Sequence, residues 1–316
     1  MKILEVKNLK VQYPTRSGPA RAVDSIAFSV EKNETLGLIG ESGCGKSTTA
    51  RAIMRIIKEP GRIVDGEILF RNEDILAMSD AQLREIRGNR VTIVRQEAQN
   101  ALNPVMSIGN QIAEVILEHQ DVDSREAWKK AREQLDIVGI SHDRANSFPH
   151  ELSGGMRQRV MIAIATACSP DFIIMDEPIT GLDVIVQRQL LNLINDLRER
   201  LNLTALFIAH DLSVVSETCD KVVVMYAGKI METADIVSLY KNPLHPYTKA
   251  LIDSYPSIRG EKKDLKSIPG TPPRLVDPPK GCRFHFRCEF AKDICRTELP
   301  EMREVDGHSV ACHLVG

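Results

Sequence analysis

The sequence lacks a strong charge of either sign. Its 316 residues carry 41 basic and 43 acidic side chains, which gives a formal net charge of −2. A protein that binds DNA or RNA through the phosphates needs a positive field, and this composition supplies none. We therefore expect no nucleic-acid partner.

Long apolar runs are also missing. The most apolar stretches, at residues 160–168 and 172–175, are far shorter than the roughly 20 residues with which a helix crosses a bilayer. The first residues, Met-Lys-Ile-Leu-Glu-Val-Lys, do not form a cationic segment followed by an apolar stretch, so we expect no secretory signal peptide. The chain is expected in the cytoplasm, and other subunits must cross the membrane if it serves a membrane process.

Apolar residues still make up 43% of the chain, enough for one large or two modest domains with buried cores. Up to about Val94 the pattern predicts short strands, at residues 3–9, 26–30, 35–39, 67–70 and 91–94. From about residue 108 to residue 168 it predicts helices. One of them begins at Ser124 and carries an apolar face of Ala127, Ala131, Leu135 and Val138.

Patterns of buried parallel strands then return at residues 172–175, 205–208 and 222–225. The helix between the first two of these carries Leu190, Ile194, Leu197 and Leu201. Beyond about Lys241 prolines become dense, with nine of the sixteen in the final 76 residues. Because proline disfavours helix interiors and central strands, we expect an irregular appendage there. The predicted domains are residues 1–240 and 241–316.

Residues 40–47, Gly-Glu-Ser-Gly-Cys-Gly-Lys-Ser, follow a short apolar strand and match the phosphate-loop pattern G-x-x-x-x-G-K-[S/T]. The glycines let backbone N–H groups point at phosphate oxygens, and the N-terminus of the following helix adds positive potential. We expect Lys46 to hold the β- and γ-phosphates and Ser47 to hold Mg²⁺. A glycine-rich turn without a ligand is the alternative, and the flanking strand argues against it. The nucleotide-binding residues expected here are Gly40, Ser42, Gly43, Cys44, Gly45, Lys46, Ser47 and Thr48.

Polar residues follow three other predicted strands. Asp176 and Glu177 end one strand and are expected at the carboxyl edge of the sheet, beside the phosphate loop. His210 and Gln96 follow two more strands. Taken singly, each has an ordinary reading: acidic residues before Pro178 form turns, and a lone histidine is more often structural than catalytic.

Residues 152–159, Leu-Ser-Gly-Gly-Met-Arg-Gln-Arg, open a second helix whose N–H groups can bind an anion. Ser153 is also a natural helix cap, but a cap alone does not need Gly154 and Gly155. Asp183 is a candidate cap for a later helix.

The phosphate loop, the second glycine motif and the acidic strand end, in this order, resemble the nucleotide-binding subunit of an ABC transporter. The resemblance implies an α/β P-loop NTPase core with an antiparallel β subdomain, a helical insertion at about residues 97–160, and a Cys-rich C-terminal extension. It also implies ATP held between two subunits.

The resemblance carries roles for single residues. It implies that Asp176 orients Mg²⁺, Glu177 positions or activates the attacking water, His210 contacts the γ-phosphate, and Gln96 contacts Mg²⁺ and water. Tyr13 stands where the family places a ring under adenine. The catalytic set is then Glu177, His210, Gln96 and Lys46. The Mg²⁺ set is Ser47, Gln96 and Asp176.

The resemblance also assigns residues 153–155 to the γ-phosphate of ATP held by the partner subunit, and Asp183 to a dimer-contact loop. Two departures from the family pattern stand out. Gln96 is followed by Glu-Ala where Asp-Pro is usual, and Gly181 replaces a frequent alanine.

Four of the seven cysteines, Cys282, Cys288, Cys295 and Cys312, lie in the last 35 residues, with no C-x-x-C pair among them. In a reducing compartment such clustering favours a metal over disulfides, and four thiolates suffice for iron–sulfur or zinc. Buried unligated cysteines are the alternative. Residues 242–248 and 269–273 resemble the C-terminal extension of oligopeptide and dipeptide importer ATPases, which implies a [4Fe–4S] cluster at these cysteines in preference to zinc.

The resemblance therefore predicts the ATPase subunit of an importer of peptides or similar small solutes, at the cytoplasmic face of the membrane. The implied partners are a second ATPase subunit, identical or related, two transmembrane permeases and an extracytoplasmic solute-binding protein. Motion is expected to pass to the permeases near residues 97–110. Alternatives are a soluble ABC ATPase that acts on nucleic acid or ribosomes, a metal-sensing regulator, and, within the family, uptake of oligosaccharides or nickel.

Overall fold

The computed structural model describes residues 1–95, 101–254 and 268–315. The chain forms two compact units, the first made of Met1–Leu76 and Phe207–Gly316 and the second of Ala77–Leu206. It passes from the second unit to the first within strand β8 (Ala205–Ile208). No helix in the described ranges is long and apolar enough to cross a membrane.

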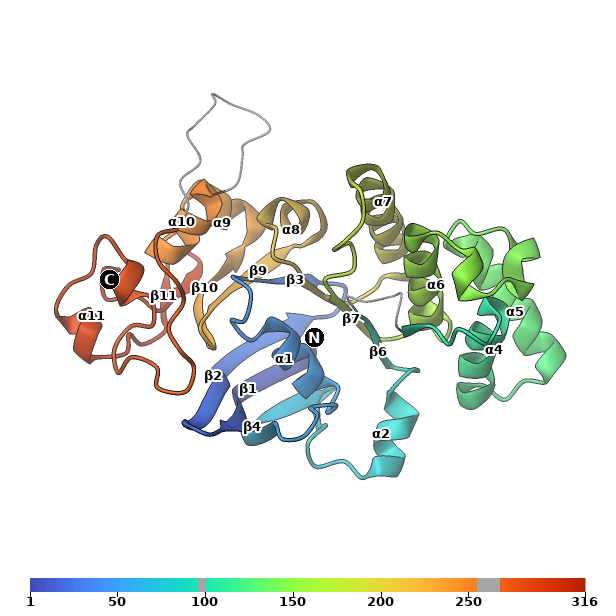
Figure 1. The fold of residues 1–316 in the computed structure, drawn as a ribbon, viewed down its shortest axis with the longest axis horizontal. Helices are drawn as coiled ribbons and strands as arrows, with labels where there is room; N and C mark the ends of the chain where they lie inside the picture. The colour runs from blue at the N-terminus through green and yellow to red at the C-terminus, as the bar shows by residue number, and fades with distance from the viewer. Residues whose placement is uncertain (96–100, 255–267, 316) are drawn as a thin grey trace. The chain divides into compact units, whose positions relative to one another are not determined.

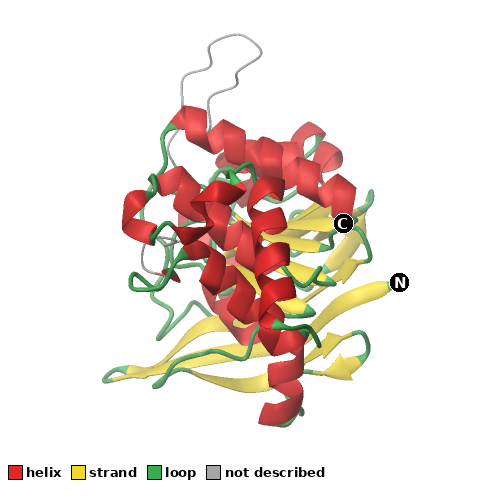
Figure 2. Cartoon of the chain, turned by 90° about the vertical axis from the view of Figure 1, so that its right-hand side faces the viewer, coloured by secondary structure: helices red, strands yellow, loops and turns green. Residues whose placement is uncertain are grey.

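The first unit contains a four-stranded antiparallel sheet, drawn in blue and cyan in Figure 1 and among the yellow strands of Figure 2. In sheet order its strands are β2 (Gly18–Glu31), β1 (Lys2–Thr15), β4 (Arg62–Phe70) and β5 (Glu73–Asp74). β1 and β2 form one long hairpin, since Thr15 pairs with Gly18. The sequence predicts only the apolar parts of both strands, because their outer halves carry polar and exposed residues.

The strand that leads into the phosphate loop lies in the second sheet of this unit. In order, its strands are β11 (Arg303–Val305), β12 (His308–Val310), β10 (Lys229–Asp235), β9 (Lys221–Tyr226) and β3 (Thr35–Ile39). β3 pairs with β9 in parallel, and the other pairs are antiparallel. The helices of the unit are α1 (Lys46–Ile53), α8 (Leu212–Thr218), α9 (Ile236–Lys241), α10 (Pro246–Asp253), the short η3 (His285–Arg287) and α11 (Ile294–Thr297).

The segment beyond Lys241 is more regular than its prolines suggest. It contributes α10, α11 and two strands, and β12 pairs with β10 through Glu232 and Val310. Pro246 is the first residue of α10, a position where its fixed φ favours a helix start. The expectation of a wholly irregular appendage is wrong, whereas the proposed boundary near residue 240 stays a prediction.

The second unit combines two parallel strands with several helices. β6 (Val91–Val94) pairs with β7 (Phe172–Asp176). The helices are α2 (Asp80–Ile86), α4 (Ile108–His119), α5 (Ser124–Ile137), the short η1 (His142–Asn146) and η2 (Pro149–Glu151), α6 (Gly154–Thr166) and α7 (Val184–Leu201). The helical insertion that the sequence predicts is therefore present.

Helix α5 illustrates how well its apolar face is predicted. Ala127, Ala131, Leu135 and Val138 are all fully buried. The helix begins at Ser124 as predicted, and Asp123 caps it by accepting a hydrogen bond from the Glu126 N–H at 2.8 Å. In α7 the predicted apolar face stops before Leu201, which is exposed in the last turn.

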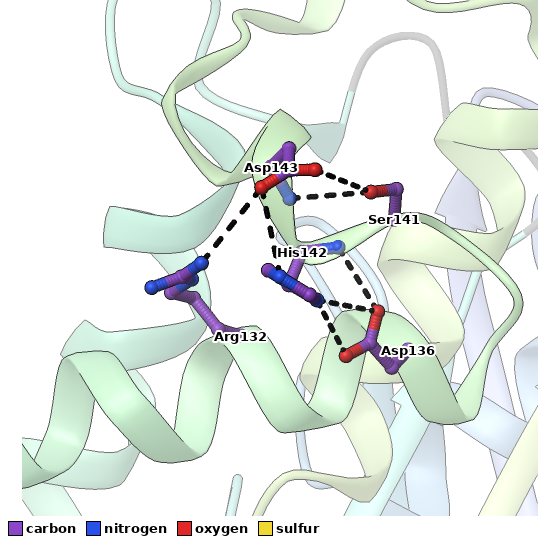
Figure 3. Close-up of polar contacts among 5 residues, drawn as sticks. All are labelled: Arg132, Asp136, Ser141, His142 and Asp143. Carbon is purple, nitrogen blue, oxygen red and sulfur yellow. Dashed lines mark hydrogen bonds and ion pairs between the residues drawn. The ribbon is translucent and has the colours of Figure 1, made fainter.

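Polar contacts fix the end of α5 to η1 at the surface of the second unit (Figure 3). The His142 N–H donates to Asp136 at 3.0 Å, and the His142 ring Nδ1 lies 2.9 Å from the same carboxylate. Asp143 contacts Ser141 and, at 3.9 Å, Arg132. These groups are largely exposed, so the cluster acts as a surface clamp of modest energy.

Candidate nucleotide-binding site

The phosphate loop connects β3 to α1 in the first unit. All five residues of β3 are buried, so the loop leaves a fixed platform. Gly40, Gly43 and Gly45 have φ values of 148°, 77° and 111°, a region that side chains rarely adopt. A Cβ at Gly40 would lie 2.1 Å from the Met225 carbonyl oxygen, and one at Gly45 would lie 2.3 Å from that of Ala22. The glycines are therefore required for the shape of the loop as well as for access to its N–H groups.

The N-terminus of α1 suits an anion. Gly45 caps the helix without a side-chain hydrogen bond, and the first turn contains no acidic residue. Its N–H groups and the positive end of the helix dipole can therefore act on phosphate. The Lys46 side chain is buried, and its Nζ donates to the Gly40 carbonyl at 2.6 Å and to the Glu41 carbonyl at 3.2 Å. This arrangement holds a cation directly over the loop.

Cys44 completes the loop as an apolar residue. It is 3% exposed, and burial raises the pKa of its thiol above the usual value. The neutral thiol adds no negative charge beside the expected phosphates. Its backbone carbonyl accepts a hydrogen bond from the Gly228 N–H at 2.9 Å, which ties the loop to the turn after β9.

Tyr13 and His210 belong to the same unit as the loop. Tyr13 lies near the end of β1, and its ring approaches Gly61 so closely that a Cβ there would lie 2.4 Å from Tyr13 Cε1. His210 follows β8 and is exposed. The next residue, Asp211, caps α8 by accepting from the Ser213 N–H at 2.8 Å. The roles of Tyr13 under adenine and of His210 at the γ-phosphate stay predictions.

The acidic strand end lies in the second unit. Asp176 is the last residue of β7 and is 6% exposed. Glu177 follows with φ of 51°, the left-handed region that is uncommon for glutamate. Thr180 Oγ1 donates to the Glu177 carboxylate at 3.2 Å, and the Thr180 N–H to its carbonyl at 3.3 Å. The ordinary turn is thus present, but its backbone conformation at Glu177 is one that tends to persist at functional sites.

The second glycine motif opens α6, also in the second unit. Ser153 caps the helix, with its Oγ accepting from the Met156 N–H at 3.3 Å. A Cβ at Gly155 would lie 2.4 Å from Val186 Cγ1, so this glycine has a packing reason that the sequence does not reveal. At Gly154 the nearest atom to an added Cβ is Leu182 Cδ2 at 3.4 Å. Both the cap and an anion site are compatible with this helix N-terminus.

Asp183 caps the neighbouring helix α7 by accepting from the Val186 N–H at 3.0 Å. Val184 and Ile185 in its first turn are 79% and 72% exposed. The capping role that the sequence predicts for Asp183 is therefore present in the structure.

The structure brings the expected loop residues together in the first unit, with Tyr13 and His210 in the same unit. Asp176, Glu177 and residues 153–155 lie in the second unit, and Gln96 lies outside the described residues. The joining of these groups into one ATP site stays a prediction. Sequence reasoning missed Arg287 and Tyr247, both of which contact Glu41 as set out below.

The prediction of an iron–sulfur cluster in the tail is wrong. Cys282, Cys288, Cys295 and Cys312 are all described, yet within residues 1–95, 101–254 and 268–315 no three His, Cys, Asp or Glu side chains form a group that could hold a metal. Burial raises the pKa of Cys282 to about 11 and also raises the pKa values of Cys288 and Cys312, so these groups are neutral thiols at neutral pH. The same finding leaves zinc without ligands. Cys282, Cys295 and Cys312 are buried and instead fill space as small apolar residues, whereas Cys288 is half-buried.

Comparison with known proteins agrees with the loop geometry. Residues 23–180 match the family model of the ABC transporter, and residues 231–295 match the oligopeptide/dipeptide transporter C-terminal region. The probable peptide ABC transporter ATP-binding protein y4tR of Sinorhizobium fredii is 46% identical, over 98% of this chain and 94% of that protein. The oligopeptide transport ATP-binding protein OppD of Bacillus subtilis is 43% identical, over 99% of this chain and 89% of that protein.

Among solved structures, the ATP-binding cassette MJ0796, a dimer bound to ADP and Pi in a post-hydrolysis state, superimposes with a TM-score of 0.67. It is 25% identical and covers 74% of this chain and 98% of its own. The predicted fold class, an ABC ATPase with α/β architecture, is confirmed. The chain belongs to the ABC transporter family, in the group of peptide transport ATP-binding proteins that carry the oligopeptide/dipeptide C-terminal region.

Proposed function

We propose that the chain is the ATP-hydrolysing subunit of a membrane importer for peptides. The single observation that carries this proposal is the loop at residues 40–47, whose glycine conformations, open helix N-terminus and buried Lys46 suit a nucleoside triphosphate. The family membership supplies the transport context.

Different residues of this chain have different roles in phosphoryl transfer. Lys46 and the loop N–H groups bind the phosphates, and Ser47 with Asp176 would hold Mg²⁺, which neutralises charge on the phosphate oxygens when bound. Glu177 orients the attacking water and accepts its proton, and His210 contacts the γ-phosphate. Gln96 would contact Mg²⁺ and the attacking water. Residues 153–155 act on the nucleotide of the partner subunit through the α6 N-terminus.

The partner of each subunit is a second ATPase, either this chain or a related one, because the similar cassette MJ0796 is a dimer. The relatives are named as ATP-binding proteins of peptide transport, so we infer two permeases and a solute-binding protein as further partners. The chain then works at the cytoplasmic face of the membrane. Residues 1–240 form the nucleotide-binding domain in this proposal and residues 241–316 the transporter-type extension.

ATP binding closes the two subunits and hydrolysis reopens them, because ATP binds the closed and open states with different affinity. The helical insertion passes this motion to the permeases, near residues 97–110. The match of residues 231–295 to an oligopeptide/dipeptide transporter region favours peptides as the solute. Oligosaccharides and nickel complexes are the alternative solutes, and the same uptake experiment tests them.

The test is uptake into liposomes that contain the chain with the permeases and the binding protein of the same gene cluster. We expect accumulation of labelled peptides that requires ATP on the side of this chain and stops when Lys46→Ala removes the phosphate-binding cation. Transport of a sugar or a nickel complex, with no peptide uptake, would show that the proposed solute is wrong. The proposed ATPase role would still hold. Failure of the purified chain to bind MgATP would overturn the proposal itself.

A further inference from the structure

We propose that Arg287 and Tyr247, from the segment of residues 241–316, are positioning residues that hold the phosphate loop through Glu41 and thereby set the affinity for ATP. The inference rests on the proposed function, since it concerns the same loop. It gives the C-terminal segment a part in nucleotide binding in addition to any contact with transport partners.

The first contact is a fork between two charged groups. Arg287 Nη1 donates to Glu41 Oε2 at 2.6 Å, and Arg287 Nη2 donates to Glu41 Oε1 at 2.9 Å. The Arg287 side chain is 5% exposed and that of Glu41 is 25% exposed. Paired, nearly parallel bonds of this kind fix orientation as well as distance, and water screens them little.

The guanidinium is itself fully engaged. Arg287 Nε donates to the Pro269 carbonyl at 2.7 Å, Nη2 to the Ile268 carbonyl at 3.2 Å, and Nη1 to the Tyr226 hydroxyl at 3.1 Å. With the two bonds to Glu41, these contacts match the five N–H donors of an arginine. Arg287 therefore cannot swing away from the loop without breaking five hydrogen bonds of a largely buried guanidinium.

The second contact fixes the backbone of the same loop residue. The Glu41 N–H donates to the Tyr247 hydroxyl at 3.0 Å. Tyr247 is fully buried, and burial raises the pKa of its hydroxyl above the usual value, so the group stays neutral. The Tyr247 ring packs against Tyr226 and Phe284, with centroids 4.6 and 5.2 Å away, so its hydroxyl has a fixed place.

These contacts act on the part of the loop that shapes the phosphate site. Glu41 follows Gly40, and Lys46 Nζ rests on the carbonyls of both residues. A carboxylate in this loop also repels phosphate oxygens, and the paired Arg287 offsets that charge. Loss of Arg287 should therefore weaken ATP binding through loop geometry and through the exposed negative charge of Glu41.

A matched control lies in the same segment. Arg283 is 2% exposed, forms a short ion pair with Asp24 and donates to the Ala227 carbonyl at 3.2 Å. Neither of these two partners belongs to residues 40–47. Arg283→Met thus removes a buried arginine and its ion pair but no direct contact with residues 40–47, and it measures the effect of losing a buried ion pair elsewhere in the same unit.

The experiment is a titration of the purified full chain with a fluorescent ATP analogue and Mg²⁺, beside thermal unfolding of each variant. We expect Arg287→Met to weaken nucleotide affinity by about tenfold or more, and Tyr247→Phe by a few-fold without loss of fold. Arg283→Met should change the affinity by less than about twofold even when it lowers the melting temperature equally. Glu41→Gln placed in the Arg287→Met background should restore part of the affinity, because it removes the unpaired charge.

Two outcomes overturn the inference while the wild-type chain binds ATP. One is that Tyr247→Phe and the folded Arg287 variants, including Arg287→Lys, bind the analogue as tightly as Arg283→Met does. The other is that affinities follow melting temperature alone across all variants, with no coupling between Glu41 and Arg287. A wild-type chain that does not bind ATP instead overturns the proposed function, and this inference with it.

Discussion

Gly155 leaves no room for a side chain beside Val186, because an added Cβ would lie 2.4 Å from Val186 Cγ1. Both residues lie in the second unit, Gly155 near the start of α6 and Val186 in the first turn of α7. The two glycines of the motif at residues 153–155 thus differ. At Gly154 an added Cβ would make only an ordinary contact, 3.4 Å from Leu182 Cδ2, so packing gives no reason for glycine there and its N–H group and flexibility remain as reasons.

We expect opposite stability effects from alanine at these two positions. Gly155→Ala should lower the free energy of unfolding by about 1–3 kcal/mol, because overpacking against Val186 outweighs the helix propensity of alanine. Gly154→Ala should be neutral or stabilising by up to about 1 kcal/mol. Urea unfolding measures both, and Val186→Ala should rescue Gly155→Ala. Equal effects of the two alanines would contradict the packing argument.

Replacement of Glu177 separates ATP binding from hydrolysis. Glu177→Gln keeps the size and most hydrogen bonds of the side chain but removes the base that accepts a proton from water. We expect ATP turnover to fall by at least about a hundredfold while ATP holds two subunits together. Size-exclusion chromatography with ATP should therefore reveal a dimer for this variant. Elution of monomer alone, with nucleotide bound, is the result that contradicts the expected dimeric site.

Local sequence patterns predicted the loop at residues 40–47, the strands beside it and the buried face of α5. These features depend on short-range chemistry: glycine conformations, strand-to-helix order and apolar periodicity. The hold of Arg287 and Tyr247 on Glu41 could not be predicted this way, because the partners lie 246 and 206 positions apart in the chain. Their side chains obey no periodic pattern that could signal the contact.

For the cysteines, the sequence pattern predicted a feature, a metal site, that the fold does not contain among the described residues. Clustering of Cys282, Cys288, Cys295 and Cys312 in sequence predicted a metal, but the segment gains its stability in other ways. β12 pairs with β10, and Phe284 packs among Tyr226 and Tyr247. A segment that joins an existing sheet and core does not need a metal to stay folded.

The cysteine result leads to a reactivity prediction. Because burial raises the pKa of Cys282 to about 11, only a small fraction of this thiol is ionised at neutral pH. Alkylation by iodoacetamide at pH 7.5, followed by mass spectrometry, should be slow at Cys282 in the native chain and fast in urea. The native rate should rise with pH up to about 11. Rapid neutral alkylation, or iron in anaerobically purified protein, would contradict the environment described here.

A buried histidine makes stability depend on pH. His245 Nδ1 accepts a hydrogen bond from the Tyr247 N–H at 2.9 Å and caps α10, and burial lowers the pKa of this ring to about 3. A proton on Nδ1 would abolish that cap and place a charge in the core. The unfolded chain binds this proton near pH 6.5, the usual histidine value, whereas the folded chain does not. Stability from this group is therefore complete above about pH 6.5 and falls as the pH drops below that value.

We expect the free energy of unfolding to decrease by at most about 1.4 kcal/mol per pH unit between pH 6.5 and pH 4 from this one residue. His245→Asn supplies the control, because an amide oxygen can accept the Tyr247 N–H bond but does not titrate. Urea unfolding at pH 7.5, 6.0 and 5.0 should give a flatter profile for His245→Asn than for the wild-type chain. If the wild-type chain and His245→Asn lose stability equally as the pH falls, protonation of His245 does not destabilise the folded chain. The burial of its ring would then not be the cause of the acid sensitivity of the fold.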